Sequence, residues 1–586
     1  MIDVNQNNRI FHFKTSINGK FARNGGFSVL ISISILIIVF LIIYPNSLLI
    51  MESFGLTFDG KDSISLEAYR EIFSNTQTYN ALKNSIILGI GTTLFSLSLG
   101  VMLAWLVCRT DFPFKKFINW MVFLSFIVPH YILGISWIEI FGRNGYLNRI
   151  LSLIAGHRVR FSDAYSLTAV IIVMGLHLYP MVFMAVSNAL RRGDPRLEEA
   201  ALLSGAGKFR VFKDITLPLM FPTLFSMGLF VFSRAIANFG VSALLLVPIY
   251  EETLTTRVFY SLNDLNLKAA SSLSMVLVGI SGLVFLLQYL LTKKKKFISS
   301  NSVMDKSSNI TLGKFRKPVS VIVCVFLSLT SVLPILSILL SSFLKRWGLP
   351  LTISNMTFKN YTDIFTNPTT IRAFANSFLY GSLAAVMAIF TAVIISYLSL
   401  RSGKKGMKML SFFSTLPMAI PNTVLAIAAV LAWSKPPFEF YSTPWILIIT
   451  YSALFLPICM KNIAGLMENI DPKLEEAARV SGANALTSVK DVLVPLILPG
   501  IKSGFILSLL IALREIPISM MLHTSGTETV GVLLFNMRSN SGSYETTSAI
   551  AVIIITLCFA GRLVNKKGKK RRHYGKLHKK CKQKIR

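Results

Sequence analysis

Two acidic, alanine-rich segments have the residue types and the spacing of a protein-docking site. The first segment covers residues 194–222 and recurs 277 positions later over residues 471–499, with 15 identities in 29 positions and no gap. Paired carboxylates at the start of a short helix, next to small residues that allow close approach, can contact basic residues of another protein. The repeated positions are Glu198, Glu199, Ala200, Ala201, Gly205 and Pro218, and then Glu475, Glu476, Ala477, Ala478, Gly482 and Pro495.

Local signals predict a short helical hairpin in each segment. Asp194 can cap the free amides of a helix that begins with Pro195, because proline at the first helical position loses no hydrogen bond. Gly205 supplies the backbone freedom for a sharp turn. We expect a second short helix from about Lys208 until Pro218. The second segment repeats each of these features.

Neither segment contains a nucleotide-binding loop. The run Gly205-Ala206-Gly207-Lys208 continues with Phe209 and lacks the upstream glycine of a phosphate-binding loop. Residues 203–207 superficially resemble an ATPase signature segment, but they lie inside the predicted docking segment. The sequence therefore predicts that the chain is not an enzyme and cannot hydrolyse ATP alone.

A second set of candidates consists of ionisable residues inside apolar runs, where such groups face the protein interior or a water path. They are His130, Glu139, His177, Arg234, Arg514, Glu515 and His523. Their spacing indicates no metal site, and the five cysteines indicate neither a metal cluster nor a disulfide framework. We expect the histidines to be satisfied inside a helix bundle.

Three polar residues are candidates for lining a translocation pathway. Glu515 corresponds to Asn238 at the 277-residue offset, and Arg514 precedes it, so Asn238, Arg514 and Glu515 form the predicted set. The alternative is that they make structural hydrogen bonds at the helix breaks that Gly240 and Pro517 impose.

Transmembrane helices are the elements that must position these residues. Hydrophobic residues make up 53% of the 586-residue chain and charged residues 15%, which excludes a set of ordinary soluble domains. The apolar runs lack the alternation of a β-barrel, so an all-α polytopic membrane protein is predicted. Two sets of six spans are expected, at roughly 27–50, 84–108, 116–141, 166–190, 219–247 and 267–292, and at roughly 318–344, 373–400, 407–433, 442–467, 496–522 and 546–564.

The duplication covers both sets of helices. Tyr69 and Asn84-Ser85 correspond to Tyr361 and Asn376-Ser377 at an offset of 292. Since the acidic segments match at 277, the first half has 15 extra residues between its third and fourth helices. The two halves are therefore expected to be parallel repeats. The predicted division is a first six-helix repeat at 1–292, a linker at 293–317, a second six-helix repeat at 318–565 and a basic tail at 566–586.

Lysine and arginine in the short loops predict the orientation of the chain. Both termini, the linker and both acidic segments fall on the cytoplasmic side. Residues 142–165 are an exception to this pattern, because they place four arginines on the predicted outer side. The first apolar run is expected to remain as a membrane helix. The tail at 566–586 holds twelve of the basic residues behind the net charge of +33, and we expect it to lie against anionic lipid or to be disordered rather than to bind nucleic acid.

On these residues, the chain resembles the membrane subunits of bacterial ATP-binding-cassette (ABC) importers. In that family a loop with the pattern of Glu199-Ala200-Ala201, Gly205, Ile215 and Leu217-Pro218 docks into a groove on the ATPase subunit. The second copy departs from this pattern only by Val492 and Val494. We name residues 194–218 and 471–495 the first and the second EAA loop.

The fused arrangement is similar to the ferric-iron permeases of this superfamily. The similarity also includes Asn238-Phe239-Gly240 with Leu254-Thr255-Thr256-Arg257, and the run Leu513-Arg514-Glu515-Ile516-Pro517. The expected substrate is therefore ferric iron, although permeases for thiamine, phosphonate, sulfate or polyamine share much of the pattern.

The resemblance implies the type I importer permease fold, in a multi-pass protein of the bacterial inner membrane. It implies that the chain forms the translocation pathway, binds no cofactor, and couples through both EAA loops to two copies of an ATPase subunit that uses ATP. It also implies an extracytoplasmic substrate-binding protein. A secondary transporter also has parallel halves, but nothing in that class requires a duplicated EAA loop. An ion channel would need a filter sequence or polar periodicity, and exporters generally carry their own ATPase and lack this loop.

Overall fold

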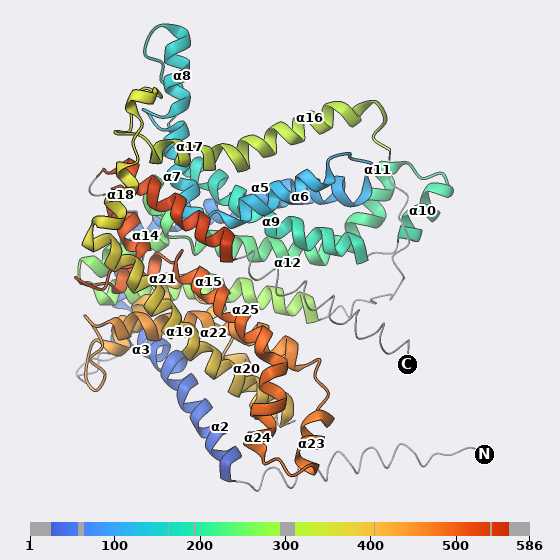
Figure 1. Cartoon of the computed structure of the whole chain (residues 1–586), viewed down its shortest axis with the longest axis vertical. Coiled ribbons are helices and arrows are strands. Elements are labelled where there is room, and N and C mark those ends of the chain that lie inside the picture. The colour runs from blue at the N-terminus through green and yellow to red at the C-terminus, as the bar shows by residue number, and fades with distance from the viewer. Residues whose placement is uncertain are drawn as a thin grey trace. The chain divides into compact units, whose positions relative to one another are not determined.

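The computed structural model describes residues 25–56, 64–161, 163–192, 195–293, 311–402, 405–539 and 542–561. These residues form helices and turns, together with an isolated bridge between Leu344 and Met356 (Figure 1). The predicted all-α class is confirmed. Asp194, the N-terminal tail, residues 294–310 of the predicted linker and the basic tail at 566–586 lie outside the described residues.

Ten of the described helices are long and apolar enough to span a membrane, and the number reaches the predicted twelve when each of two bent pairs counts as one span. Both bends occur at the predicted third span of a half, directly after Pro129 and Pro421. Proline cannot continue the preceding helix and restricts the residue before it, which explains the breaks. The bent pairs are Lys115–Ile127 with His130–Ala155, at 100°, and Gly406–Met418 with Asn422–Trp433, at 109°.

In the first half, short helices precede the second span and follow the third, the fourth and the fifth. In chain order the elements are α2 (Gly25–Ile38), η1 (Val39–Ile43), α3 (Tyr44–Ser53), α4 (Glu67–Ser74), α5 (Thr76–Arg109), α6 (Lys115–Ile127), α7 (His130–Phe141), α8 (Tyr146–Ala155), α9 (Leu167–Arg192), α10 (Pro195–Leu203), α11 (Lys208–Val211), η2 (Phe212–Thr216), α12 (Leu217–Ile236), α13 (Gly240–Leu245), η3 (Val247–Ile249), α14 (Leu254–Asn263) and α15 (Leu267–Lys293).

The second half repeats this order, except that its described residues between the third and fourth spans contain no counterpart of α8. The elements are η4 (Gly313–Phe315), α16 (Arg316–Leu327), η5 (Ser328–Val332), α17 (Leu333–Ser342), η6 (Ile353–Asn355), α18 (Lys359–Thr366), α19 (Pro368–Arg401), α20 (Lys405–Phe413), η7 (Leu416–Met418), α21 (Asn422–Trp433), α22 (Pro444–Met467), α23 (Lys473–Val480), α24 (Ala485–Ser488), η8 (Val489–Leu493), α25 (Val494–Ala512), α26 (Pro517–Leu522), α27 (Val530–Ser539) and the helix Tyr544–Gly561.

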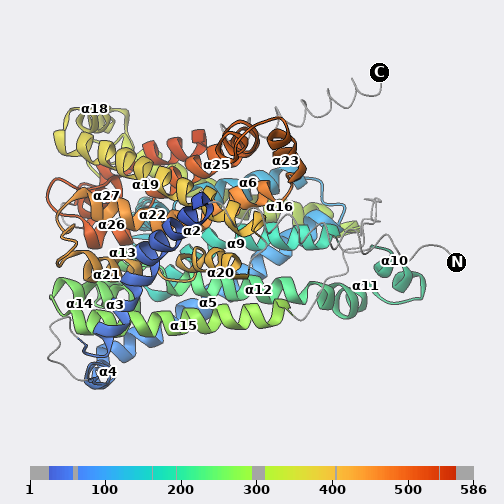
Figure 2. The ribbon, with the colours of Figure 1, turned by 90° about the horizontal axis from the view of Figure 1, so that it is seen from below.

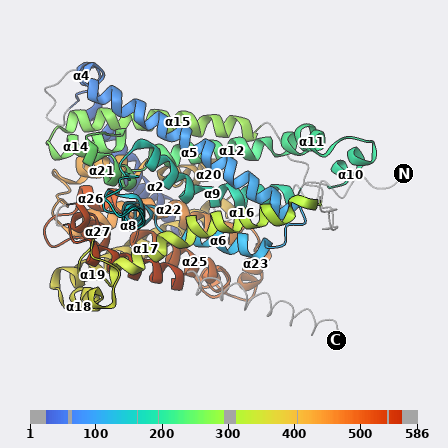
Figure 3. The same ribbon diagram turned by 90° about the horizontal axis from the view of Figure 1, so that it is seen from above.

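The chain divides into two compact units, of which unit 2 comprises residues 53–371 and 533–559. Its long helix α5 packs against α9 and α12, and α15 packs against α12 and α14 (Figures 2 and 3). Glycines permit the close approach of α5 and α9. A Cβ atom at Gly100 would lie 2.7 Å from Val182, and one at Gly175 would lie 2.4 Å from Phe95. Small residues at this contact therefore let the two backbones come together.

Unit 1 comprises residues 1–52, 372–532 and 560–586. Within its described residues, α22 packs against α21, α25 and α26. The crossing of α22 and α25 also requires a glycine, because a Cβ atom at Gly500 would lie 2.9 Å from the Asn462 carbonyl oxygen. Both units are therefore built on one close helix pair with small residues at the contact.

The first helix of each half packs in the compact unit that contains most of the other half. In unit 2, α16, η5 and α17 pack against α6 and α7, and the hydroxyls of Ser125 and Ser331 lie 2.7 Å apart. In unit 1, η1 packs against α22, and the ring centroids of Phe40 and Trp433 lie 5.7 Å apart. The compact units therefore differ from the two sequence repeats, and the predicted division into repeats and linker remains a statement about the sequence.

Four π turns interrupt the described helices, and each ends two residues before a proline. The turns η1, η2, η5 and η8 precede Pro45, Pro218, Pro334 and Pro495. Proline has no amide hydrogen for the carbonyl four residues earlier, and its ring pushes that carbonyl away. In each case that carbonyl lies inside the π turn, which accommodates the proline without ending the helix.

This geometry corrects one sequence prediction. The expected second short helix does not stop at Pro218, because α11 continues through η2 into the membrane span α12. The same continuity joins α24 through η8 to α25 in the second half. Each EAA loop is therefore one short helix and a turn, followed directly by a long helix.

The EAA loops and the breaks of the fifth spans lie at opposite ends of the long helices. In unit 2, α10 and α11 lie at one end of α12, and α14 lies at the other (Figures 1 and 3). In unit 1, α23 lies at one end of α25 and α26 at the other (Figures 2 and 3). The two groups of candidate residues are thus separated by the length of a span.

Candidate functional site

The first EAA loop is a short helix that a glycine closes. Gly205 follows α10 with a φ of +85°. The Gly205 amide donates to the Leu202 carbonyl, and the Ala206 amide to the Ala201 carbonyl, each at 3.0 Å. This pair of bonds is the Schellman ending, in which a residue with positive φ lets the chain satisfy the last carbonyls of a helix. The sharp turn predicted at Gly205 is confirmed.

The second EAA loop has the same ending. Gly482 has a φ of +94° and closes α23 with the same pair of amide-to-carbonyl bonds, both 3.0 Å long. At the start of this loop, Asp471 Oδ1 accepts the Lys473 amide at 3.0 Å. The predicted aspartate cap is therefore present in the second copy. Its counterpart in the first copy, Asp194, lies outside the described residues.

Glu198, the first carboxylate of the first EAA loop, is bound within the chain. Arg109 Nε at the end of α5 lies 3.1 Å from Glu198 Oε2 and donates to Oε1 at 3.2 Å. Thr216 Oγ1 donates to Oε1 at 3.0 Å. Both members of the ion pair are largely buried. The carboxylate therefore ties α10 to the adjoining ends of α5 and α12.

Glu475 makes the same connection in the second EAA loop. Arg401 Nε at the end of α19 donates to Glu475 Oε1 at 3.0 Å, and Arg401 Nη2 donates to the Ile470 carbonyl at 3.1 Å. Ser488 Oγ donates to the Glu475 carbonyl at 3.2 Å. The pair is again largely buried, so both copies anchor their helix by one internal arginine.

Sequence reasoning missed the two arginines as partners, although a signal existed. Arg109 and Arg401 are separated by the offset of 292 that relates the helices before them, and each is the last residue of its helix. The second carboxylates lie nearer the surface, since Glu199 is half-buried and Glu476 is exposed. In each EAA loop, the first carboxylate of the Glu-Glu pair therefore makes structural contacts within the chain.

Each EAA loop also presents apolar side chains to the outside. Leu203 and Val480, which correspond at the offset of 277, are both 90% exposed. Leu197 and Leu474 are about half exposed, and Ala200 and Ala477 are exposed as well. A repeated exposed apolar face marks an interaction surface more strongly than a single exposed leucine does. Ala200 and Ala477 belong to the predicted set, whereas the four larger apolar side chains were not predicted, although the offset of 277 relates them in pairs.

We expect that reversing one charge of the buried pair releases the first EAA loop from the bundle. Arg109→Glu places two carboxylates together, and breaking a buried pair costs about 3–5 kcal/mol. Limited proteolysis should therefore cut the loop several-fold faster, and the exchange Arg109→Glu with Glu198→Arg should restore most of the protection. The same cleavage rate in Arg109→Glu and the unsubstituted chain would contradict this role of the pair.

Two of the pathway candidates cap short helices at the breaks. Asn238 Oδ1 accepts the Val241 amide of α13 at 3.0 Å. Glu515 Oε1 accepts the Ile518 amide of α26 at 2.9 Å, and Glu515 Oε2 accepts the Ser519 amide at 2.9 Å. Both side chains are buried. The geometry supports the structural alternative for both residues, and pathway lining stays a prediction.

The arginines near these breaks have partners within their own helices. Arg514 Nε donates to the Leu510 carbonyl at 3.0 Å. The Arg234 guanidinium lies 5.5 Å from the centroid of the Phe230 ring, a cation–π distance. Arg514 and Glu515 both lie in the break between α25 and α26, and their side chains bind different groups.

The other ionisable candidates lie within the bundle of their own unit. In unit 2, Ser548 Oγ donates to the buried Glu139 Oε1 at 2.6 Å, and the ring centroids of His130 and His177 are 5.2 Å apart. In unit 1, His523 Nδ1 lies 3.1 Å from the Met520 carbonyl oxygen. No group of three His, Cys, Asp or Glu side chains in the described part of the chain could hold a metal ion.

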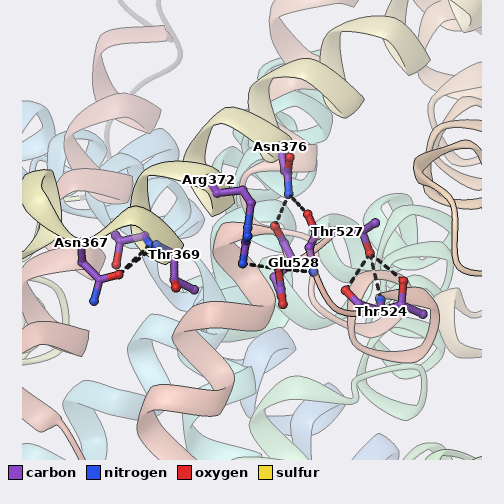
Figure 4. Close-up of polar contacts among 9 residues, drawn as sticks. Asn367, Thr369, Arg372, Asn376, Thr524, Thr527 and Glu528 are labelled. Atoms are coloured by element: carbon purple, nitrogen blue, oxygen red, sulfur yellow. Dashed lines mark hydrogen bonds and ion pairs between the residues drawn. The ribbon is translucent and has the colours of Figure 1, made fainter.

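The repeated Asn-Ser pairs hold the segment that follows each break. Asn376 Nδ2 donates to the Glu528 and Gly526 carbonyls, each at 3.0 Å, and Arg372 lies 3.6 Å from the Glu528 carboxylate (Figure 4). Ser377 Oγ accepts the Val530 amide at 2.8 Å. In unit 2 the same roles fall to Asn84, which donates to the Glu252 carbonyl, and to Ser85, which accepts the Leu254 amide. The Asn-Ser pairs that recur at the offset of 292 therefore make the same structural hydrogen bonds in both halves.

Comparison with known proteins identifies relatives of this duplicated architecture. The family model described as "Binding-protein-dependent transport system inner membrane component" matches residues 96–296 and again residues 384–571. The ferric transport system permease protein FbpB of Actinobacillus pleuropneumoniae is 26% identical over 90% of this chain and 76% of its own length. The putative ferric transport system permease protein FbpB 1 of Haemophilus influenzae is 26% identical over 84% of this chain and 77% of its own length. The sulfate transport system permease protein CysT of Salmonella typhimurium is 24% identical over 44% of this chain and 88% of its own length.

Proposed function

Because the chain belongs to the family of binding-protein-dependent transport system inner membrane components, we propose that its two EAA loops couple substrate movement to ATP hydrolysis on a separate subunit. The chain is the duplicated, multi-pass inner-membrane permease of an ABC importer, without an ATPase domain of its own. Membership of the family implies an ATPase and a periplasmic binding protein as partners.

The apolar face that both EAA loops repeat is the observation that carries the coupling proposal. Leu203 and Val480 are each 90% exposed on a helix that an internal arginine anchors. Burying a side chain of this size in a partner contributes about 1.5–3 kcal/mol. A helix that is anchored to the bundle can transmit a movement of the ATPase subunit to the membrane spans. A loop without the anchor would move without displacing the spans. Two equivalent loops favour two copies of the ATPase subunit.

Ferric iron is the substrate that we propose. The support comes from the ferric permeases that align over most of this chain, including both halves. The relative that names sulfate aligns over less than half of it, and sulfate is therefore the second candidate. Iron here is cargo that the binding protein delivers, and we propose that the chain itself holds no cofactor.

The orientation follows from the same proposal. If the EAA loops meet an ATPase, they lie in the cytoplasm, and both termini lie there as the basic loops predict. The breaks at Asn238 and Glu515 then lie toward the outer side, because they are at the other end of the long helices (Figure 3). Residues 142–165 belong to the outer side in this arrangement.

Uptake by cells depleted of the chain tests the substrate. We expect the uptake of labelled ferric iron to fall to near background, with thiamine, phosphonate and sulfate uptake unchanged, because the proposed pathway for iron is then missing from the membrane. Re-expression of the chain should restore uptake of iron alone. Loss of sulfate uptake with normal iron uptake would remove the iron assignment and leave the importer mechanism in place.

A further inference from the structure

The 15 extra residues of the first half fall within residues 142–165, whose described part is a loop around α8. The buried Asn148 organises it, because its Nδ2 donates to the Gly142 carbonyl at 3.0 Å and its Oδ1 accepts the Phe161 amide at 2.9 Å. Arg143 and Asp163 close the two ends of the loop with an ion pair of 2.9 Å.

This loop exposes large apolar side chains. Leu153 is 83% exposed, Ile154 is 78% exposed and Phe161 is 73% exposed. Ile150 is more than half exposed and shares a helix face with Leu153 and Ile154, because residues three and four apart lie on one side. The opposite face carries Asn148, which is buried. The helix is therefore amphipathic, with its apolar face turned away from its own unit.

The direction of α8 indicates what covers that face. The segment His130–Ala155, which contains α8, is bent by 100° from the span Lys115–Ile127. In Figure 1, α8 projects from unit 2 across the direction of α9 and α12, and Figure 3 looks along its axis. A helix that leaves the bundle sideways enters the space that lipid occupies beside the spans, whereas a soluble partner meets the ends of the spans.

The charges around α8 agree with a lipid surface. Residues 142–165 contain four arginines and one aspartate. Arg158 and Arg160 are exposed next to the apolar face. Amphipathic helices with basic flanks lie in the interface, with the apolar face at the boundary of acyl chains and the cations at lipid phosphates.

We propose that α8 lies in the membrane interface on the predicted outer side, with Ile150, Leu153, Ile154 and Phe161 in the lipid. The exposed Arg158 and Arg160 then lie at anionic headgroups. The proposal rests on the membrane assignment of the chain and is independent of the substrate.

Spin labels at two positions of the loop test this inference. Leu153→Cys and, as the matched control, Asn144→Cys are labelled in a chain whose five native cysteines are replaced by serine, in vesicles of phosphatidylethanolamine and phosphatidylglycerol. Two reagents that collide with the spin label are compared: molecular oxygen, which concentrates in the membrane, and a nickel chelate, which stays in water. We expect the ratio of oxygen to nickel collisions to be several-fold higher at position 153 than at position 144, with or without the binding protein.

Two results would overturn the inference. Equal ratios at the two positions would place the apolar face in water, and protection of position 153 only after the loaded binding protein is added would assign the face to that protein. Because Cys459 and Cys558 are buried, a second measurement keeps all native cysteines. Leu153→Trp should add fluorescence that brominated phospholipids quench, relative to the unsubstituted chain, and added fluorescence without quenching counts against the lipid assignment.

Discussion

A chain that carries Gly205→Pro and Gly482→Pro is expected to insert into the membrane and to lose transport. The two glycines have φ values of +85° and +94°, and proline fixes φ near −65°. Proline also removes the amide that donates to the carbonyl of Leu202 or Arg479. A cost of about 3 kcal/mol would reduce a docking equilibrium roughly a hundredfold. The measurement is co-purification of the ATPase subunit together with substrate uptake.

The matched control for this pair is Gly205→Asn with Gly482→Asn. Asparagine adopts positive φ more readily than other residues with a side chain and keeps the amide. A Cβ atom at either glycine meets nothing within 4 Å, so the added side chain fits. We expect the asparagine pair to retain most of the transport. Normal uptake in the proline pair would refute the coupling role of the EAA loops.

The second large effect is expected at Glu515, whose carboxylate binds several donors at once. Its two oxygens accept the amides of Ile518 and Ser519 and the hydroxyl of Ser519, and Asn422 Nδ2 lies 3.4 Å away. In Glu515→Gln, a side-chain NH₂ faces some of these donors. Each buried donor left without a partner costs about 1–3 kcal/mol. We therefore expect a clear fall in the thermal unfolding temperature of the purified permease.

A structural role of Glu515 therefore does not make glutamine a neutral replacement, because both carboxylate oxygens accept hydrogen bonds. Asn238→Ala is the control, because it removes a single capping bond and should cost about 1 kcal/mol. Uptake per folded molecule should change little in both variants if the roles are structural. A Glu515→Gln protein with normal thermal stability and abolished iron uptake would instead place the carboxylate in the pathway.

Features with a strong local cause could be predicted from the sequence. Continuous apolar runs gave the spans, because backbone in lipid must be satisfied within helices. Gly205 predicted a sharp turn, and its φ is +85°. The identities at offsets of 277 and 292 predicted the duplication that both family matches confirm.

Features that depend on contacts between distant residues could not be predicted. Hydropathy identifies α2 and α16 as membrane helices, but it does not show that each packs in the unit of the other half, because the hydropathy of a span does not specify which helices it contacts. The pairing of Arg109 with Glu198 depends on where α5 ends relative to α10. The effect of a proline also depends on the turn before it. Pro218 follows the π turn η2 and the helix continues, whereas Pro129 follows no π turn and the helix ends.

Transport in reconstituted vesicles tests the central claim most directly. The chain is inserted with its ATPase subunit, and the binding protein loaded with labelled ferric iron is added on the side opposite the ATPase. The account predicts that iron accumulates only with ATP and all three proteins, that the chain alone hydrolyses no ATP, and that Leu203→Asp with Val480→Asp abolishes accumulation. ATP hydrolysis by the chain alone, or iron accumulation without the ATPase subunit, would contradict it.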